Sequence, residues 1–377
     1  MTTATLEFSA GQRVLCRPGV SDPNLRAWDA ADELLLDEAI RRVHAGDRVL
    51  VVDDQFGALT LGLSDYAPVS VADSAVLEGA LSTNAPLNPG IPSPAQLASW
   101  LNPPQGPFDL IVMRVPRQSE YLAWLLRWVN SALAGNGCLL AGGMIKHLPD
   151  RSVDVFAEAM PTQAVLPARK KARVVVCRRG EASLAGWSGL WKGYSVPGVS
   201  VAVEAMPAVF ARDRLDIGTR ELLPLVAPAV ARLPKGARVL DLACGNGVLG
   251  LAALACRDDI RVEFADVSAQ AVASVRHNLM RCGFEARASV CHSDGVDRGA
   301  GNYQLILLNP PFHEGGVVGD HIALRLFRDA ARHLAPEGAL LMVGNRHLGY
   351  HRSLKRYFSS VVQRAASPRF VVFEACL

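Results

Sequence analysis

The chain contains one long internal repeat. Residues 48–61, RVLVVDDQFGALTL, align without gaps on residues 238–251, RVLDLACGNGVLGL, 190 residues further along. Three shorter matches follow in the same order, residues 71–73, 108–112 and 137–140 against residues 264–266, 303–307 and 338–341. A single repeat of this length indicates a duplicated domain, because solenoid repeats run to only about 50 residues. Two unrelated domains of one class could share such segments, but four matches in register favour duplication.

Each copy alternates short apolar runs with helical patterns, which predicts βαβ units around a mostly parallel sheet. In the second copy the predicted strands are residues 237–242, 261–265, 288–292, 304–308, 339–343 and 370–374. The apolar pattern breaks at RRGE, residues 178–181, and we place the joint between residues 178 and 196. The sequence therefore predicts an α/β protein with two tandem doubly wound, Rossmann-like domains, residues 1–185 and 196–377.

Composition excludes several classes of protein. The chain contains no run of 18 apolar residues, so we expect no membrane-spanning helix. Residues 1–10 lack the pattern of a secretory signal. The eight cysteines include no CxxC pair, so we expect neither a metal site nor disulfides. Free cysteines indicate a reducing compartment, and we expect a cytoplasmic location. The net charge of +3 is small, so any surface that binds nucleic acid has to be a local one.

A glycine-rich turn, DLACGNGVLG at residues 241–250, follows the first predicted strand of the second copy. Gly245, Asn246 and Gly247 would let the backbone approach a ligand at the carboxyl end of the sheet. The spacing also fits the dinucleotide fingerprint, so an NAD-dependent oxidoreductase is an alternative. Asp241 favours S-adenosylmethionine instead, because a carboxylate repels a pyrophosphate and attracts a sulfonium cation.

Polar residues at other strand ends complete a predicted cofactor site. Asp266 could accept both hydroxyls of a ribose, or it could cap the following helix. Ser293 and Asp294 end the third strand, where Asp294 could accept a hydrogen bond from adenine or lie in a solvated loop. Asp216, ahead of the first strand, could cover the cofactor or cap a helix.

The tetrapeptide Asn309, Pro310, Pro311 and Phe312 follows the apolar strand of residues 304–308. Two prolines cannot continue a central strand, so they fix a stiff turn at its carboxyl end. The Asn309 amide and the Pro310 carbonyl could accept both hydrogens of an exocyclic amine, and Phe312 offers a face on which a base could stack. Methyl transfer to that amine would rest on positioning and electrostatics, without a strong base. The alternative is a purely structural Pro-Pro turn.

The first copy lacks this chemistry. Val51, Gln55 and Phe56 stand where the second copy has its aspartate, first glycine and asparagine, and residues 114–117, RVPR, replace the tetrapeptide. A phenylalanine at that point of the turn would fill the cofactor pocket. We therefore predict a degenerate N-terminal domain that stabilises the other half or binds RNA.

Three groups of basic residues could bind phosphates. They are Arg114 with Arg117; Arg169, Lys170, Lys171 and Arg173; and Arg346, His347, Arg352, Lys355 and Arg356. Any one of them could equally be a solvated face. Three groups in a chain of small net charge favour RNA binding.

With the duplication and both motifs, the sequence resembles the tandem-domain bacterial ribosomal RNA guanine-N2 methyltransferases, which comprise a 16S and a 23S enzyme. The likeness is carried by residues 24–33, 54–59, 170–173, 209–212, 215–218, 241–250, 309–313 and 345–350. Residues 24–33 and 54–57 are more similar to the 23S type, as is the chain length. Ala243 and Cys244 depart from the Gly-Cys or Gly-Thr pairs that often stand there.

The resemblance implies two Rossmann-like class I methyltransferase domains, of which only the second is catalytic. It further implies methylation of one guanine N2 in 23S rRNA by S-adenosylmethionine, with the ribosomal RNA as partner and no membrane or metal involved. The N-terminal domain would then be an inactive duplicate that helps to bind RNA. A 16S rRNA target and a non-catalytic RNA-binding assembly factor are the alternatives.

Overall fold

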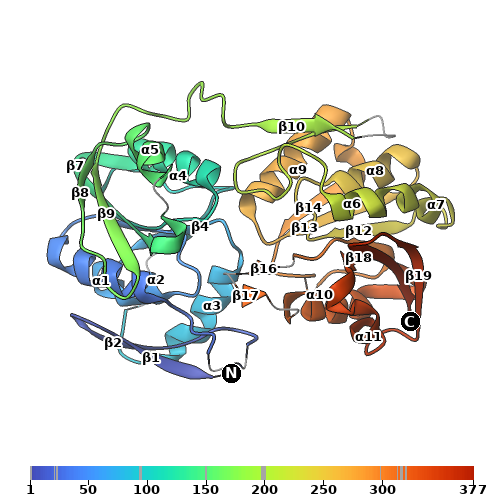
Figure 1. The fold of residues 1–377 in the computed structure, drawn as a ribbon, viewed down its shortest axis with the longest axis horizontal. Coiled ribbons are helices and arrows are strands. Elements are labelled where there is room, and N and C mark those ends of the chain that lie inside the picture. The colour runs from blue at the N-terminus through green and yellow to red at the C-terminus, as the bar shows by residue number, and fades with distance from the viewer. Residues whose placement is uncertain are drawn as a thin grey trace. The chain divides into compact units, whose positions relative to one another are not determined.

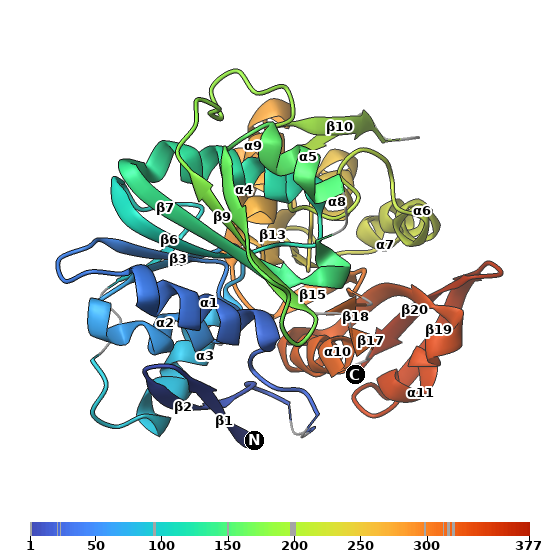
Figure 2. The ribbon, with the colours of Figure 1, turned by 60° about the vertical axis from the view of Figure 1, so that its left-hand side comes forward.

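The structure is a computed structural model that describes the chain except residues 1, 21, 23, 93–95, 149–150, 197–200, 298, 312, 315–316 and 319–320. The side chains of residues 151, 313–314 and 317–318 are also not described. The chain divides into two compact units, Met1–Leu190 and Trp191–Leu377. Each unit contains its own seven-stranded sheet (Figures 1 and 2).

The sheet of the C-terminal unit has the strand order β14-β13-β12-β15-β18-β20-β19. Its strands are β12 (Arg238–Leu242), β13 (Arg261–Asp266), β14 (Ala288–His292), β15 (Tyr303–Leu308), β18 (Leu334–Asn345), β19 (Ser360–Ala366) and β20 (Phe370–Cys376). Neighbouring strands are parallel except at β20, which is antiparallel to both β18 and β19. All six strands that the sequence predicted here are present. The sequence did not predict β19, because this edge strand is mostly exposed and lacks an apolar pattern.

Helices cover both faces of this sheet. The helices on one face are α6 (Ile217–Leu222), α7 (Val226–Ala231), α8 (Val248–Cys256) and α9 (Ala269–Cys282), and those on the other are α10 (His321–His333) and α11 (Tyr350–Leu354) (Figure 1). Two small hairpins complete the unit, β10 (Lys192–Ser195) with β11 (Ala202–Ala205) and β16 (His313–Glu314) with β17 (Val317–Val318). None of the described helices combines the length and apolar composition that crossing a bilayer requires.

The N-terminal unit repeats this architecture, with the strand order β5-β4-β3-β6-β7-β9-β8 and with β9 antiparallel to its neighbours. Its strands are β1 (Thr3–Phe8), β2 (Gly11–Cys16), β3 (Val49–Val52), β4 (Val69–Ala72), β5 (Gln96–Ser99), β6 (Phe108–Arg114), β7 (Leu133–Met144), β8 (Thr162–Val165) and β9 (Ala172–Arg178). Its helices are α1 (Ala30–Arg42), α2 (Ala58–Gly62) and α3 (Val76–Asn84) on one face and α4 (Ser119–Ala132) and α5 (Arg151–Ala157) on the other (Figure 2). The two sheets match strand for strand, which confirms the predicted tandem doubly wound fold.

A buried asparagine makes the same three hydrogen bonds in both units. In the C-terminal unit, Asn278 Oδ1 accepts from Glu204 N at 2.9 Å, and Asn278 Nδ2 donates to Glu204 O at 2.8 Å and to Asn246 O at 3.0 Å. In the N-terminal unit, Asn84 bonds Cys16 N, Cys16 O and Phe56 O at 2.9, 3.0 and 2.9 Å. The asparagine therefore ties the small hairpin at the start of each unit to the turn after its first central strand.

Helix α9 extends this attachment to the segment that follows the hairpin. Gln270 and Ser274 lie one turn apart on the helix face that carries Asn278, and all three side chains are fully buried. Gln270 Oε1 accepts from Ala208 N at 2.7 Å, and Ser274 Oγ accepts from Met206 N at 3.0 Å. The three side chains thus satisfy the backbone N–H groups of Glu204 in β11 and of Met206 and Ala208 just after it.

A buried carboxylate anchors the glycine-rich turn in each unit. Asp241 Oδ2 accepts from Gly250 N at 2.8 Å in the C-terminal unit. In the N-terminal unit the equivalent of Gly250 is Thr60, whose N–H donates at 2.8 Å to Asp54 Oδ2. Both units thus have a carboxyl group bonded to the start of the helix. In the N-terminal unit that group is on Asp54, three residues after the position equivalent to Asp241. This anchor is a structural role of Asp241 that its position in the motif did not reveal.

We expect Asn278→Ala to lower the free energy of unfolding by about 2–4 kcal/mol, because it leaves several buried backbone groups without partners. Urea unfolding monitored by circular dichroism measures the change. Asn302 is exposed on the same unit, and Asn302→Ala should shift stability by no more than about 0.5 kcal/mol. Equal effects of the two variants would contradict the attachment role of Asn278.

The stability of the C-terminal unit should depend on the protonation of Asp241. Burial raises the pKa of the Asp241 carboxyl to about 8, although the Gly250 bond opposes this rise. In the unfolded chain the pKa is about 4, so the folded protein holds a proton that the unfolded chain has released. This contribution to stability is complete below about pH 4 and is lost as the pH rises through about 8.

Asp241→Asn cannot ionise and keeps an oxygen for Gly250 N. The unfolding free energy of the variant minus that of the wild type should therefore increase as the pH rises from about 4 to about 8, by up to about 1.4 kcal/mol per pH unit. Urea unfolding of both proteins at a series of pH values gives this difference. A difference that stays constant would show that Asp241 is ionised in the folded protein throughout.

Candidate functional site

The carboxyl ends of β12, β13, β14 and β15 place the predicted site residues along one edge of the C-terminal sheet. Leu242, the last residue of β12, pairs with Ala265 of β13 and with Leu308 of β15. The glycine-rich turn, Asp266 and Asn309 therefore follow neighbouring strands at the same level. This edge is where doubly wound sheets bind their ligands.

The three glycines of the turn have different surroundings. A Cβ on Gly247 would approach Val275 to 3.0 Å, and one on Gly250 would approach the Phe264 ring to 2.3 Å. A Cβ on Gly245 would meet no atom within 4 Å, and the residue has a left-handed φ of +56°. Gly247 and Gly250 thus serve the packing of the protein, whereas Gly245 borders open space.

Ala243 also adopts a left-handed φ, of +55°, and the equivalent Asp53 of the first unit has +56°. A side chain is strained in this region and glycine is not, which explains the glycine that often stands there in the resembling family. The small methyl group of Ala243 keeps this departure from the motif compatible with the turn.

Asp266 holds the turn from the neighbouring strand. Its Oδ2 accepts from Gly245 N at 2.8 Å and its Oδ1 from Ser268 N at 2.9 Å. The cap of α9 is Ser268, whose side chain accepts from Ala271 N, so Asp266 is not itself the cap. Burial raises the pKa of Asp266, while these backbone bonds oppose the rise. A carboxylate has about four acceptor positions, so two remain for ligand hydroxyls.

Ser293 and Asp294 follow β14 beside Asp266. Ser293 N donates to Asp266 O at 2.9 Å, and Ser293 Oγ donates to Gly295 O at 2.8 Å. Asp294 forms a bidentate ion pair with Arg325 of α10. The Asp294 carboxylate therefore already has a protein partner, in helix α10.

The side chain of Asn246 is buried and joins the turn to the segment ahead of β12. Its Nδ2 donates to the Tyr194 hydroxyl at 3.1 Å and to Ala211 O at 3.4 Å, and its Oδ1 accepts from Val248 N at 3.3 Å. Asn278 holds its carbonyl as well. The hydrogen bonds of this residue thus orient the backbone between Gly245 and Gly247.

The amide of Asn309 is held in one orientation by two residues at the start of α6. Asn309 Nδ2 donates to Asp216 Oδ2 at 3.1 Å and to Thr219 Oγ1 at 2.9 Å. A carboxylate only accepts, so the nitrogen of the amide must face Asp216. Asn309 Oδ1 is buried and has no hydrogen-bond partner among the described residues. The structure thus presents a fixed acceptor without a donor at the end of β15.

Asp216 performs one of the two roles that the sequence left open for it, the cap, and its role of covering the cofactor stays a prediction. It caps α6, with its Oδ2 accepting from Thr219 N at 2.9 Å, and the same oxygen binds the Asn309 amide. Thr219 was not among the site residues predicted from the sequence. The available signal was its position three residues after Asp216, because a capping side chain accepts a hydrogen bond from the backbone N–H of that residue.

The rest of the tetrapeptide is partly described. Pro310 is buried and Pro311 is exposed. Phe312 lies outside the described residues, so the predicted stacking face stays a prediction.

Aromatic side chains occupy the equivalent edge of the N-terminal unit. Trp100 follows β5 at the point where Ser293 follows β14. Its ring meets Trp124 of α4 edge-on at a centroid distance of 4.9 Å, and its Nε1 donates to the Tyr121 hydroxyl at 2.9 Å. Phe56 is buried, with the Arg17 guanidinium 4.9 Å from its ring centroid. Aromatic side chains thus lie at the end of β5 and in the turn after β3, where the second unit has Ser293 and Asn246.

The prediction that Arg114 is available to bind phosphate is wrong. Arg114 is largely buried, and its two terminal nitrogens bind both oxygens of Asp29 at 2.7 and 2.8 Å. Asp32 lies 3.1 Å from the same guanidinium. Two carboxylates of the same unit therefore already neutralise this charge. Arg117 is exposed.

Family models match both halves of the chain. The model of the RLMG N-terminal domain covers residues 3–181, and that of the methyltransferase small domain covers residues 200–374. Among solved structures, the chain matches the 16S rRNA N2 methyltransferase RsmC of T. thermophilus in complex with AdoMet and guanosine, with a TM-score of 0.76. The match covers 99% of this chain and 97% of the other at 22% identity, and it shows the shared tandem fold.

Curated relatives match over nearly the whole length. The chain is 38% identical over 370 residues to "Ribosomal RNA large subunit methyltransferase G" of Pseudomonas entomophila, covering 95% of this chain and 96% of the relative. It is 37% identical over 368 residues to the protein of the same name in Alcanivorax borkumensis, covering 94% and 92%. These matches and both family models place the chain in the ribosomal RNA large subunit methyltransferase G family.

Proposed function

We propose that the C-terminal unit transfers a methyl group from S-adenosylmethionine to the exocyclic N2 amine of a guanine in 23S ribosomal RNA. Family membership supports methyl transfer, and the name of the relatives supports the large-subunit RNA. The observation that carries the assignment of the site is the buried Oδ1 of Asn309, an acceptor without a partner in the described part of the chain. An amine donor of the substrate would supply the missing hydrogen bond.

The turn and its neighbours fit the cofactor. Gly245 offers open space beside a bare backbone, and Asp266 keeps two acceptor positions for ribose hydroxyls. Asp241 lies buried below the same turn and holds it through the bond from Gly250 N, and a sulfonium cation bound beside the turn would favour the ionised form of its carboxyl. S-adenosylmethionine, when bound, supplies an electrophilic methyl group. Ser293 and Asp294 would border the adenine, with Asp294 shared between that role and Arg325.

Asn309 acts on the nucleophile. Its Oδ1 accepts one N–H of the guanine amine and holds the nitrogen in place for attack. As the C–N bond forms, positive charge develops on that nitrogen, and the carbonyl dipole stabilises it. The Asp216 carboxylate at Nδ2 polarises the amide and increases the negative charge on Oδ1. The methylated nitrogen is acidic enough to lose its proton without a dedicated base.

The remaining members of the tetrapeptide complete the proposal. The Pro310 carbonyl would accept the second hydrogen of the amine, and Phe312 would stack against the base. A guanine in a paired region has to leave its helix to reach this edge of the sheet. The N-terminal unit lacks the glycine and the amide on which the proposed site depends, and it would stabilise the protein or help to bind RNA.

The alternatives have weaker support. The 16S enzyme among solved structures shares the fold at 22% identity, whereas the relatives named for the large subunit reach 38%. Membership in a methyltransferase family argues against the NAD-dependent oxidoreductase. An assembly factor without catalysis would have no use for an amide acceptor that two side chains hold towards an absent donor.

Asn309→Ala should lower kcat/KM for methylation of 23S rRNA by about 100-fold or more, because the positioned acceptor is lost. The assay uses rRNA from cells that lack the protein, labelled methyl groups and mass mapping of the product. The affinity for S-adenosylhomocysteine should stay within about twofold, since binding alone does not require the amine acceptor.

Mapping also tests the substrate. Wild type should restore one N2-methylguanine to 23S rRNA in such cells and Asn309→Ala should not. A mark restored in 16S rRNA instead would overturn the choice of target. Full activity of Asn309→Ala would overturn the assignment of the site.

Thr219→Val and Thr219→Ser form a matched pair for the orientation of Asn309. Valine has a similar shape but no hydroxyl to accept from Nδ2, so we expect kcat to fall by about 10- to 100-fold through misorientation of the amide. Serine keeps the hydroxyl and should retain kcat within about threefold. The KM for S-adenosylmethionine should change little in either. Equal kcat values in the two variants would show that Thr219 does not orient Asn309.

A further inference from the structure

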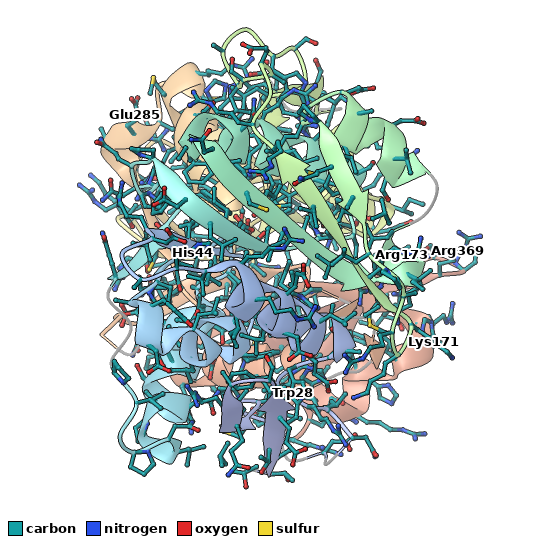
Figure 3. All side chains as sticks on the ribbon, turned by 90° about the vertical axis from the view of Figure 1, so that its left-hand side faces the viewer. Trp28, His44, Lys171, Arg173, Glu285 and Arg369 are labelled. Carbon is teal, nitrogen blue, oxygen red and sulfur yellow. The ribbon has the colours of Figure 1, made fainter. Side chains whose placement is uncertain are left out.

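The three basic groups differ in how far acidic side chains already neutralise them. In the N-terminal unit Arg114 is bound to Asp29 and Asp32, as described above. At the β8–β9 turn (Figure 3), Lys170 lies 2.6 Å from Glu33 and Arg169 lies 3.5 Å from Asp37. In the C-terminal unit, none of Arg346, His347, Arg352, Lys355 and Arg356 forms an ion pair with a described acidic residue. Only this third group keeps its full charge for a ligand.

The charge of the third group is concentrated by the local sequence. From Gly338 to Phe373 the chain contains no aspartate or glutamate, but it contains Arg346, Arg352, Lys355, Arg356, Arg364 and Arg369. This segment forms most of β18, all of helix α11 and β19, and the first part of β20. Arg369 extends outward from the β19–β20 turn (Figure 3). Arg364 pairs with Glu374, which leaves five uncompensated cations in the segment.

A hollow of about 450 Å³ lies within this segment. The exposed side chains of Arg346, His351 and Lys355 line it, and no acidic residue does. Val361, Val371 and Phe373 contribute apolar surface, and Asn345 and Gln363 contribute amides. Cations suit phosphates, whereas apolar surface and amides suit sugars and bases. This mixture of cations, apolar groups and amides matches a polynucleotide better than an acidic protein surface.

The hollow adjoins the proposed catalytic turn within the same unit. Strand β18, which ends at Asn345, pairs in parallel with β15, which ends just before Asn309. Asn345 also pairs with Phe370 at the start of β20. The ring of Phe370 would lie 3.1 Å from a Cβ on Gly218, two residues after Asp216. Phe370 packs on the opposite face of the sheet from Val371 and Phe373, so strand β20 lies between the hollow and the residues that hold the Asn309 amide.

We propose that this hollow binds the sugar-phosphate backbone of the RNA next to the target nucleotide, with Arg346 and Lys355 on phosphates. The inference rests on the proposed function and assigns to the catalytic unit an RNA-binding site of its own. RNA held here would be anchored a short distance from Asn309. Binding energy gained on the backbone would then help to present the base to the catalytic turn.

The test compares two double variants of the full-length protein that remove the same charge. Arg346→Gln with Lys355→Gln changes the hollow, and Lys235→Gln with Arg276→Gln removes exposed cations elsewhere on the same unit. Arg346→Lys with Lys355→Arg keeps the charge. Filter binding to 23S rRNA from cells lacking the protein measures Kd at salt concentrations between 50 and 200 mM. Thermal melting and the affinity for S-adenosylhomocysteine check that each variant is folded.

We expect the hollow variant, Arg346→Gln with Lys355→Gln, to bind the RNA at least about tenfold more weakly at 100 mM salt. The slope of log affinity against log salt concentration should be smaller by about 1.4–1.8, as for two lost phosphate contacts. The control variant and the charge-keeping variant should bind as the wild type does. A hollow variant with the Kd and salt slope of the control would overturn this inference, whatever else the hollow accommodates. Wild type that methylates no rRNA would overturn the proposed function itself, so the two failures are distinguishable.

Discussion

The hydrogen bonds of one buried asparagine hold the glycine-rich turn of each unit in place. Asn278 joins the backbone of Glu204 to the carbonyl of Asn246, and Asn84 makes the equivalent bonds in the other unit. A backbone turn with several left-handed residues is unstable unless its surroundings determine it. The clamp from the helix, together with the carboxylate below the turn, provides that constraint. The space beside Gly245 depends on it.

The proposed catalytic turn is organised on the same principle, because neighbouring side chains determine the orientation of its polar group. Asn309 could present either end of its amide to a ligand. The Asp216 carboxylate and the Thr219 hydroxyl accept from its nitrogen and leave the oxygen buried without a partner. An unpartnered buried carbonyl costs free energy in the absence of a ligand. A substrate amine would relieve this cost, which ties binding of the base to the start of α6.

Comparison of the two units separates the residues that maintain the fold from those proposed to serve the chemistry. Both units keep the strand order, the asparagine clamp and a carboxylate bonded to the first turn of the helix. Only the second keeps a bare glycine beside open space and an amide at the end of its fourth strand. In the first, Trp100 and Tyr121 occupy the sheet edge and Arg114 is bound by acids. The first unit thus retains the architecture without the residues of the proposed site.

The sequence by itself determined the duplication, the α/β class, six strands of the second sheet and the edge that carries the site. Hydrophobic periodicity and turn residues are local properties, and a repeat needs no knowledge of contacts. The sequence could not determine which atoms meet across long stretches of chain. The bond from Asn309 to Asp216 spans 93 residues, and the neutralisation of Arg114 by Asp29 spans 85. The tertiary structure alone decided these pairings, because hydrogen bonds and ion pairs act over a few ångströms in space regardless of separation along the chain.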